Sequence, residues 1–417
     1  MNTEREPDRW CLRSWLWVFL CAAAIFATVP VARRIQGFVY NSVGREFFTY
    51  AVLSVIIAGL AAVLYFLAFR LRVRSISQYA WLFTGAGLYV YFTIQLRQHP
   101  EEAVHFLEYG ALAYFLFRAL SCRIRDRTIY MTVVLAVLFV GTLDEFIQWL
   151  IPKRYWDYRD VGINTLAGVF FSIIMWKGIR PETISRPVVR RLSIRILAGV
   201  ITLDLLFLGL CLSNTPDAVR RYTAAFEPLM WLRGEEVMTE FGYAHKDPEI
   251  GTFYSRLTIG ELREHDMKSS STYNKLPVDE ITSLEDYETL RRTYTRVTDP
   301  FMYEFLQHII ERDLSLDEFL RSGNQKSGLT AFKENLILEK YFGSTLRYFN
   351  AVWSREKRDH FKDSQDWLKK NYTGGKGKMI TSFSLKTAWL FIIVILAVVW
   401  TAGELWRMAR DCRRCRG

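Results

Sequence analysis

Long apolar runs fill the N-terminal half of the chain and return once near its C-terminus. A membrane-spanning helix needs roughly 20 mainly apolar residues. The third and sixth runs are short, and the fourth to sixth are interrupted by polar residues. The pattern predicts an all-α, polytopic transmembrane bundle of about eight spans, at Ser14–Ala32, Phe48–Phe69, Tyr79–Ile94, Ala103–Leu120, Thr128–Leu150, Val161–Trp176, Ile194–Leu212 and Ala388–Leu405.

The pattern also divides the chain into three parts. Residues 1–212 are predicted to form the membrane bundle, and residues 386–417 a final span with a basic tail. Between them, residues 213–385 are rich in charged side chains and contain no run long enough to span. We expect this insertion to be a separate domain.

Local signals predict that the insertion is mostly helical. Its helix-start signals resemble capping boxes or an N-cap followed by proline, at Thr258-x-x-Glu261, Ser283-x-x-Asp286, Ser315-x-x-Glu318 and Asp299-Pro300. A helical stretch is expected from about Leu329 to Lys370, with a break near Gly343. Gly, Pro and Ser gather in 244–252 and 268–277, where we expect loops.

Charge fixes the expected orientation. The net charge is +11, and Lys and Arg gather after the second, fourth, sixth and eighth spans. These are alternate loops, and cytoplasmic loops carry the excess of positive residues. Both termini are therefore predicted to be cytoplasmic and the insertion extracytoplasmic. Arg33 and Arg34, which fall in the first outer loop, are the exception. We interpret the basic excess as topology and expect no nucleic-acid partner.

The six cysteines do not form a spacing pattern that is typical of a disulfide framework. None lies between 213 and 385, so the insertion is expected to depend on its own core and not on internal disulfides. Cys412-x-x-Cys415 on the tail lacks the second pair that a zinc site would need. We interpret it as part of a basic tail beside anionic lipid headgroups.

Polar residues interrupt three consecutive spans. His105 and Glu108 open the fourth span, and Asp160 and Asn164 open the sixth. The fifth span ends in a polar wedge whose members share one helix face, namely Asp144, Glu145 and Gln148. The topology places all of these residues at the outer ends of their helices. Ionisable groups within spans are costly and usually mark a site that faces the bundle interior.

Three interpretations of this cluster stay open. It is a buried network that holds three helices together, a ligand-binding or catalytic pocket open to the outer side, or a metal site. Imidazole and carboxylate ligands suit zinc or manganese, and the candidates are His105, Glu108, Glu145 and Asp160. Arg154 and Arg159, in the loop between the fifth and sixth spans, would neutralise the acids or bind a ligand.

Other candidates are weaker. Asp204 lies in the middle of the seventh span, and we expect it to pair with a Tyr, Thr or Arg of another helix. The insertion contains no G-x-S-x-G, H-E-x-x-H or Gly-rich phosphate loop. Its four histidines are scattered, which favours structural or surface roles for His245, His265, His308 and His360.

Taken in order, the interrupted spans resemble a known family. The carrying segments are His105-Phe-x-Glu108-Tyr109, Asp144-Glu145-x-x-Gln148, Pro152-Lys-Arg154 and Asp160-x-x-x-Asn164-x-x-x-Gly168. This ordered set is similar to the VanZ-like membrane domain, over residues from about 80 to 176. The chain has Lys153 where the family often has Gly. The resemblance implies a bacterial inner-membrane protein of the cell envelope, in a family whose namesake is linked to teicoplanin resistance.

The resemblance and the residues together suggest a function. We expect the pocket to bind or modify an envelope component, such as a lipid-linked glycan or a peptidoglycan intermediate. In a catalytic version, His105 or Glu145 is the general base. The alternative is a non-enzymatic scaffold or sensor whose outer domain recruits an envelope protein. Membrane lipid is the expected partner; no cofactor is expected, and a divalent metal and catalysis itself stay open.

Overall fold

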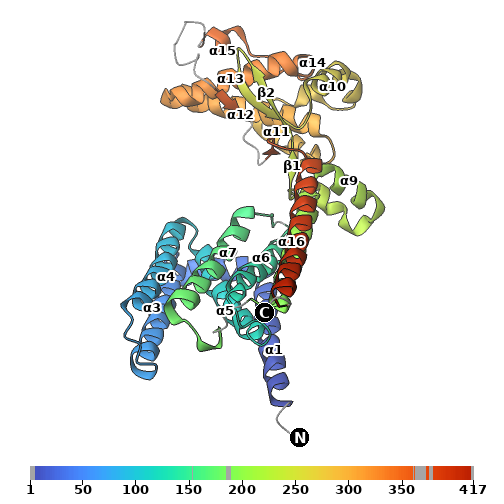
Figure 1. Cartoon of the computed structure of the whole chain (residues 1–417). Coiled ribbons are helices and arrows are strands. Elements are labelled where there is room, and N and C mark those ends of the chain that lie inside the picture. The colour runs from blue at the N-terminus through green and yellow to red at the C-terminus, as the bar shows by residue number, and fades with distance from the viewer. Residues whose placement is uncertain are drawn as a thin grey trace. The chain divides into compact units, whose positions relative to one another are not determined.

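The structure is a computed structural model of the whole chain, shown in Figure 1. It describes residues 5–152, 154–184, 189–359, 361, 372–374 and 379–414, with only the backbone described along 5–8 and 405–414. Lys153, His360, the end of the predicted helical stretch and Cys415 therefore lie outside the described residues. The chain divides into two compact units, residues 1–211 with 389–417, and residues 212–388.

The first unit is a helical bundle. The elements of its N-terminal half are α1 (Arg5–Thr28), α2 (Ala32–Ser42), α3 (Phe47–Tyr65) with the π-helical turn η1 (Phe66–Arg70), α4 (Ile76–Gln95), η2 (Leu96–Gln98) and η3 (Pro100–Ala103). They are followed by α5 (Val104–Leu120), α6 (Thr128–Trp149), α7 (Tyr158–Ile173) with η4 (Ile174–Ile179), η5 (Glu182–Ile184), α8 (Arg191–Leu212) and α16 (Leu385–Arg414).

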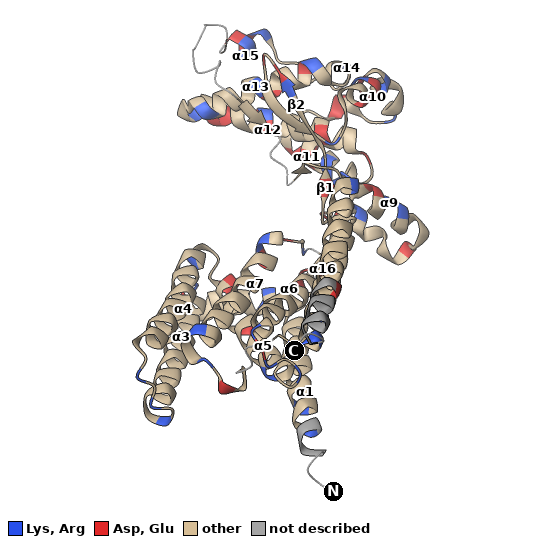
Figure 2. Ribbon diagram, viewed as in Figure 1, with Lys and Arg blue, Asp and Glu red and all other residues tan. Residues whose placement is uncertain are grey.

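Each of the eight predicted spans coincides with one of these helices. Six are long and apolar enough to cross a membrane, at Arg9–Thr28, Phe47–Arg70, Thr128–Trp149, Tyr158–Ile179, Arg191–Leu212 and Leu385–Glu404. The protein is therefore a helical membrane protein. Helices α4 and α5 are not among the six, so the count of eight stays a prediction. Figure 2 shows the helix shafts mainly in tan, with Lys and Arg toward the helix ends and loops.

Helices α5, α6 and α7 form the core of the bundle. Helix α5 packs against α1, α6 and α7, and α4 packs against α7. Two glycines let α6 and α7 approach closely. A Cβ on Gly168 would lie 3.1 Å from Val137 Cβ, and one on Gly141 would lie 3.0 Å from Asn164 Cβ. The predicted contact between the fifth and sixth spans is confirmed.

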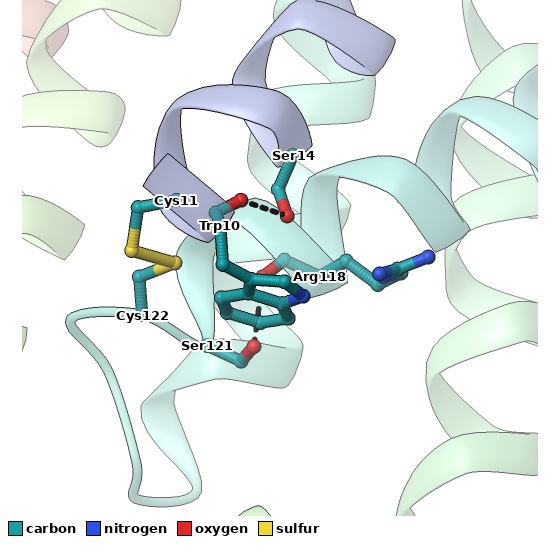
Figure 3. The surroundings of a disulfide bond; sticks show 6 residues. All are labelled: Trp10, Cys11, Ser14, Arg118, Ser121 and Cys122. Carbon is teal, nitrogen blue, oxygen red and sulfur yellow. Dashed lines mark hydrogen bonds between the residues drawn. A yellow bond between two sulfur atoms is a disulfide. The ribbon is translucent and has the colours of Figure 1, made fainter. Parts of the chain in front are cut away.

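A disulfide joins the start of α1 to the end of α5. It links Cys11 to Cys122, which are 111 residues apart in the sequence (Figure 3). The Arg118 guanidinium lies 5.8 Å from the centroid of the Trp10 ring beside it. This bond could not be predicted from the sequence, because no local spacing relates two cysteines so far apart.

The same end of the bundle is held by a buried aspartate. Asp126 lies in the α5–α6 loop, and its Oδ2 accepts from Ser193 Oγ at 2.6 Å and from the Arg190 amide at 3.3 Å. Its Oδ1 accepts from the Thr128 amide and hydroxyl. Asp126 thus joins the starts of α6 and α8, where orphan helix amides need acceptors.

The second unit contains helices and short strands. Its helical elements are α9 (Pro216–Ala225), η6 (Glu227–Gly234), α10 (Ile259–Thr272), η7 (Val278–Glu280), α11 (Leu284–Thr293), α12 (Pro300–Ser322), α13 (Gln325–Tyr341), α14 (Gly343–Tyr348) and α15 (Arg355–Asp359). Strand β1 (Glu240–Phe241) pairs in parallel with β5 (Met379–Ile380). A second sheet has the order β2 (Tyr243–Asp247), β3 (Gly251–Ser255), β4 (Tyr372–Gly374), with β2 antiparallel and β4 parallel to β3.

Several expectations for this unit are confirmed. Both capping boxes at Thr258 and Ser283 form, and Asp299 caps α12 with Pro300 in the first turn. The helical stretch breaks at Phe342, between α13 and α14. The core gathers aromatic and aliphatic side chains of α12, α13 and α14 around Phe301, Phe305 and Phe342.

Three local expectations are wrong, in whole or in part. Residues 244–252 form most of a β-hairpin, because Asp247 accepts from the amides of Glu249 and Ile250 and so closes the turn before Gly251, whose φ is +108°. The expected 268–277 loop is wrong for its first half, where α10 continues to Thr272, and it is confirmed from Tyr273 to Pro277. Ser315 starts no helix, because it lies buried inside α12.

Candidate functional site

The polar residues predicted from the sequence meet at one end of the bundle. This polar cluster comprises His105, Glu108 and Tyr109 on α5, Asp144, Glu145 and Gln148 on α6, and Asp160 and Asn164 on α7. Helices α5 and α7 begin at this end and α6 ends there, so the loop between α6 and α7 covers the same region. The antiparallel arrangement of α6 and α7 explains why residues far apart in the sequence converge.

Helix α5 presents an imidazole beside a carboxylate. His105 Nδ1 lies 3.3 Å from Glu108 Oε2, an ion-pair distance without the alignment of a hydrogen bond. The His105 side chain is 22% exposed and that of Glu108 is 26% exposed. His105 also interacts electrostatically with Asp144 and Asp160. The His105 imidazole therefore interacts with carboxylates of both α6 and α7.

The α6 wedge is internally bonded. Gln148 Nε2 donates to Glu145 Oε1 at 2.8 Å and to Asp144 Oδ2 at 3.2 Å. Its Oε1 accepts from the Arg154 guanidinium. The amide thus separates two carboxylates and connects them to a cation of the loop. This bonding follows from the i,i+3 and i,i+4 spacing of the wedge.

Glu145 also fixes the start of α7. Its Oε2 accepts from the Asp157 amide at 3.2 Å, and Asp157 in turn caps α7 by accepting from the Arg159 amide at 2.9 Å. Asp160 follows in the first turn and interacts electrostatically with both Glu145 and His105. Glu145 is 1% exposed, so its carboxylate points into the bundle and toward the other members of the cluster.

Three buried members of the cluster have polar atoms that lack a well-aligned hydrogen bond. Within the described part of the chain, no hydrogen-bond partner meets Asn164 Oδ1 or Nδ2, Tyr109 Oη or Asp144 Oδ1. Asn164 and Tyr109 are fully buried, and Asp144 is 1% exposed. Native proteins pair the large majority of buried polar atoms, so each exception needs an explanation. The Tyr109 hydroxyl and the Asp144 carboxylate lie close enough to pair with each other, so Asn164 is the member whose polar atoms have no partner among the described residues.

The rim adds residues that sequence reasoning missed. Arg159 Nη2 bonds Glu102 Oε2 at 2.8 Å, which holds the start of α7 to η3. The neighbouring Glu101 accepts from Gln36 and Tyr40 of α2. Glu101 and Glu102 precede the fourth predicted span and belong to no spacing pattern. Two consecutive acids beside a Pro at a span boundary were the available signal.

A metal site has no geometric support. Among the described residues, no three or more His, Cys, Asp or Glu side chains are grouped so as to hold a metal ion. The four expected ligands, His105, Glu108, Glu145 and Asp160, do not form such a group.

Asp204 lies outside the cluster. It is buried in α8, at 4% exposure, and neither carboxylate oxygen has a hydrogen-bond partner within the described ranges. The Tyr, Thr or Arg partner expected from the sequence is not found there. The aromatic ring of Phe207, one turn further on, packs against Phe139 and Phe146 of α6.

The fold and the cluster define a class of protein, a helical membrane protein with a polar cluster at one end of three core helices. Residues 16–180 match the VanZ/LLP1 family model. This region is VanZ-like, and the match extends beyond the stretch 80–176 that the motifs marked. It covers less than half of the 417 residues and includes none of the second unit. Neither the curated proteins nor the solved structures include a match.

Proposed function

We propose that the polar cluster is a pocket at the extracytoplasmic face of a bacterial inner membrane, where it binds or modifies a lipid-linked component of the cell envelope. The strongest support is the buried side chain of Asn164, whose amide oxygen and nitrogen have no hydrogen-bond partner among the described residues. The VanZ-like match supports the envelope setting. Linkage to glycopeptide resistance belongs to the family's namesake and is not part of the proposal.

The energetics favour a ligand over a purely structural network. A buried polar group left without a partner costs about 1–3 kcal/mol. Interhelical hydrogen bonds in membranes contribute only about 0.6 kcal/mol on average. A network that only held helices together would therefore gain little from Asn164, which bonds nothing in the described structure. A ligand with hydroxyl or amine donors and carbonyl acceptors would complete its contacts.

The residues assign roles in a catalytic version of this pocket. His105 or Glu145 is the general base, because His105 is partly exposed beside Glu108 and Glu145 faces Asp160. The neighbouring acid orients the base. Arg154 contacts a phosphate or carboxylate of the ligand at the rim, and Arg159 contributes once its pairing with Glu102 opens.

The orientation is part of the proposal. With both termini in the cytoplasm, the Lys and Arg clusters of alternate loops lie on the cytoplasmic side. The polar cluster and residues 213–385 then face outward. Extracytoplasmic exposure gives the pocket access to envelope intermediates in the outer leaflet of the same membrane.

Isosteric substitutions test this function. Glu145→Gln and Asp160→Asn remove charge and keep shape, and Gly162→Ala on α7 is the matched control because a Cβ there meets nothing within 4 Å. We expect all three proteins to accumulate normally, and only the first two to lose co-purifying polyprenyl-linked lipids in mass spectrometry of membrane extracts. A loss of folded protein in both, with retained lipid per molecule, would instead support the scaffold.

A further inference from the structure

One arginine of α2 lies on the helix face that contacts η3. Gln36 Nε2 donates to Glu101 Oε1 at 2.9 Å, and the Tyr40 hydroxyl donates to the other oxygen of the same carboxylate. Positions 33, 36 and 40 share one face of a helix. Arg33 therefore lies on the face of α2 that meets η3, while Arg34 lies on a neighbouring face.

Arg33 meets a second guanidinium at this place. Arg154, on the loop between α6 and α7, is close enough for Arg33 to repel it electrostatically. Arg154 bonds the neutral amide of Gln148. Neither arginine has a carboxylate within ion-pair distance among the residues that the structure describes. Arg154 also interacts electrostatically with Glu145 and Asp144, so the two cations lie beside each other at the edge of the acidic cluster.

The arginine pair is positively charged, whereas the interior of the cluster is acidic. The interior holds four carboxylates, of Glu108, Asp144, Glu145 and Asp160, and one imidazole. An anion is repelled from such a site, whereas hydroxyl and amine donors are attracted. The arginine pair is the place for an anion, and guanidinium groups bind phosphate through paired hydrogen bonds. The arrangement suits a ligand with a phosphate at one end and a hydroxyl-rich group at the other.

The opposite face of α2 indicates where the phosphate comes from. Ile35 is 48% exposed and Phe38 is 71% exposed, and no residue of this helix is buried. A short helix with one apolar and one polar face, placed between two spans, is typical of the membrane interface. The phosphates of lipids lie at that depth. Arg33 and Arg34, the exceptions to the predicted charge rule, then have a functional explanation.

We propose that Arg33 and Arg154 form a clamp for the phosphate of a membrane lipid, with the lipid's polar head group directed toward the carboxylates of the cluster. This inference rests on the proposed function and specifies its substrate class, a phosphate-bearing lipid with a hydroxyl-rich head group. Arg33 is a ligand-binding residue that the sequence motifs do not mark.

Two lipid probes test the clamp and the pocket separately. The full chain is placed in phosphatidylcholine nanodiscs that contain either bare polyprenyl phosphate or polyprenyl phosphate carrying a sugar, and binding is followed by native mass spectrometry. Arg33→Gln is expected to weaken binding of both lipids by at least about tenfold. The matched control, Arg34→Gln, removes the same charge from the next residue and is expected to stay within about twofold.

The outcomes distinguish this inference from the proposed function. Equal binding by the Arg33→Gln and Arg34→Gln proteins, or no binding of bare polyprenyl phosphate by the unmodified chain, would overturn the clamp. Glu145→Gln is expected to weaken only the sugar-bearing lipid. If it changes neither lipid while Arg33→Gln weakens both, the clamp stands and the pocket fails. Displacement of the lipid by millimolar inorganic phosphate would refute the assignment to a lipid headgroup.

Discussion

The side chain of Asn164 supports a ligand-binding role for the polar cluster. Its amide is fully buried against the Cα of Gly141, which leaves room for the side chain but offers it no partner. Gln148, one helix away, satisfies both of its amide atoms with protein groups. Because of this contrast, we assign ligand binding to Asn164 and a structural role to Gln148.

Asp204 allows a simple prediction at the same scale. Replacing an unpartnered buried polar group with an apolar one removes a desolvation cost, so Asp204→Leu is expected to keep or raise the thermal unfolding temperature. The change corresponds to roughly 1–3 kcal/mol in unfolding free energy. Asp204→Asn, which keeps a polar group there, is the control. A clear loss of stability in the Leu variant, measured in detergent by scanning fluorimetry, would show that the carboxylate has a partner.

The sequence predicted part of the site at this scale. The i,i+3 and i,i+4 spacings of His105 with Glu108 and of Asp144 with Gln148 require only helical geometry, and the contacts follow. Arg33, Glu101 and Glu102 were not predicted, because their partners lie on elements separated by long stretches of chain. The periodicity of one helix does not show which charged residue of a distant loop will contact it.

At the scale of elements, close packing of α6 and α7 positions the cluster. Three carbons of Val137 lie 3.1 to 3.2 Å from where a Cβ of Gly168 would be. Val137 is β-branched and stiff at χ1, so it cannot easily move aside. The small residue at this crossing sets the spacing that brings Asp160 and Asn164 to the α6 wedge.

Two glycines of α7 give a matched pair of substitutions. Gly168→Ala is expected to destabilise the bundle by about 1–3 kcal/mol through overpacking against Val137. Gly162→Ala meets nothing within 4 Å and should instead gain up to about 1 kcal/mol from helix propensity. Thermal unfolding of both proteins in one detergent provides the comparison. Equal shifts would mean that the α6–α7 crossing is not tightly packed.

A buried pair links two helices of the second unit. His308 Nδ1 on α12 lies 2.5 Å from Glu334 Oε2 on α13, and the Tyr372 hydroxyl of β4 donates to the other oxygen. Burial lowers the pKa of His308, but the charge of Glu334 outweighs it and the pKa is raised above the ordinary 6.5. The raised pKa stabilises the fold below pH about 6.5, and this contribution is lost as the pH rises through the folded-state value.

Hydrogen exchange can measure that loss. After correction for intrinsic rates, protection of amides in α12 and α13 is expected to fall as the pH rises above about 6.5, in the unmodified chain only. His308→Gln should abolish this dependence and cost roughly 3–5 kcal/mol, because it leaves the Glu334 charge unpaired. His265→Gln is the control on exposed α10. A pH dependence that persists in His308→Gln would assign it to another group.

Helix existence was easier to predict than strand existence. The apolar runs and the caps at Thr258, Ser283 and Asp299 are local signals, and the structure has these helices. The β2–β3 hairpin was missed because its turn depends on Asp247, whose second oxygen is held by Tyr341 of α13. Strand β4 lies more than 100 residues after β3 in the sequence, so no local pattern predicts that the two strands pair.

For the whole molecule, the disulfide between Cys11 and Cys122 tests the predicted orientation. Both residues lie at the same end of the first unit, so they share one side of the membrane. On the cytoplasmic side, thiols are kept reduced. If the predicted orientation holds, Cys11 and Cys122 are two free thiols in the cell and form the disulfide only after oxidation. In the opposite orientation, the disulfide is already formed in the cell.

Alkylation after the cells are lysed directly in acid separates these two cases, because acid preserves the thiol state of the cell. In a chain with Ser at its other four cysteine positions, the denatured protein should add two maleimide-polymer labels if Cys11 and Cys122 are cytoplasmic. Unlabelled protein that gains two labels only after reduction would contradict the predicted topology. Cys11→Ser and Cys122→Ser proteins, each with one added label, calibrate the shift.

The central claim is that the polar cluster is a working site and not only a fastening between helices. The most direct measurement is native mass spectrometry of the sugar-bearing polyprenyl phosphate bound to the unmodified chain and to Asn164→Ala, which removes the unpartnered amide without breaking a protein hydrogen bond. If Asn164 binds the lipid, the variant should show unchanged or higher thermal stability together with at least about tenfold weaker lipid binding. Unchanged lipid binding, with a clear loss of stability, would contradict the central claim.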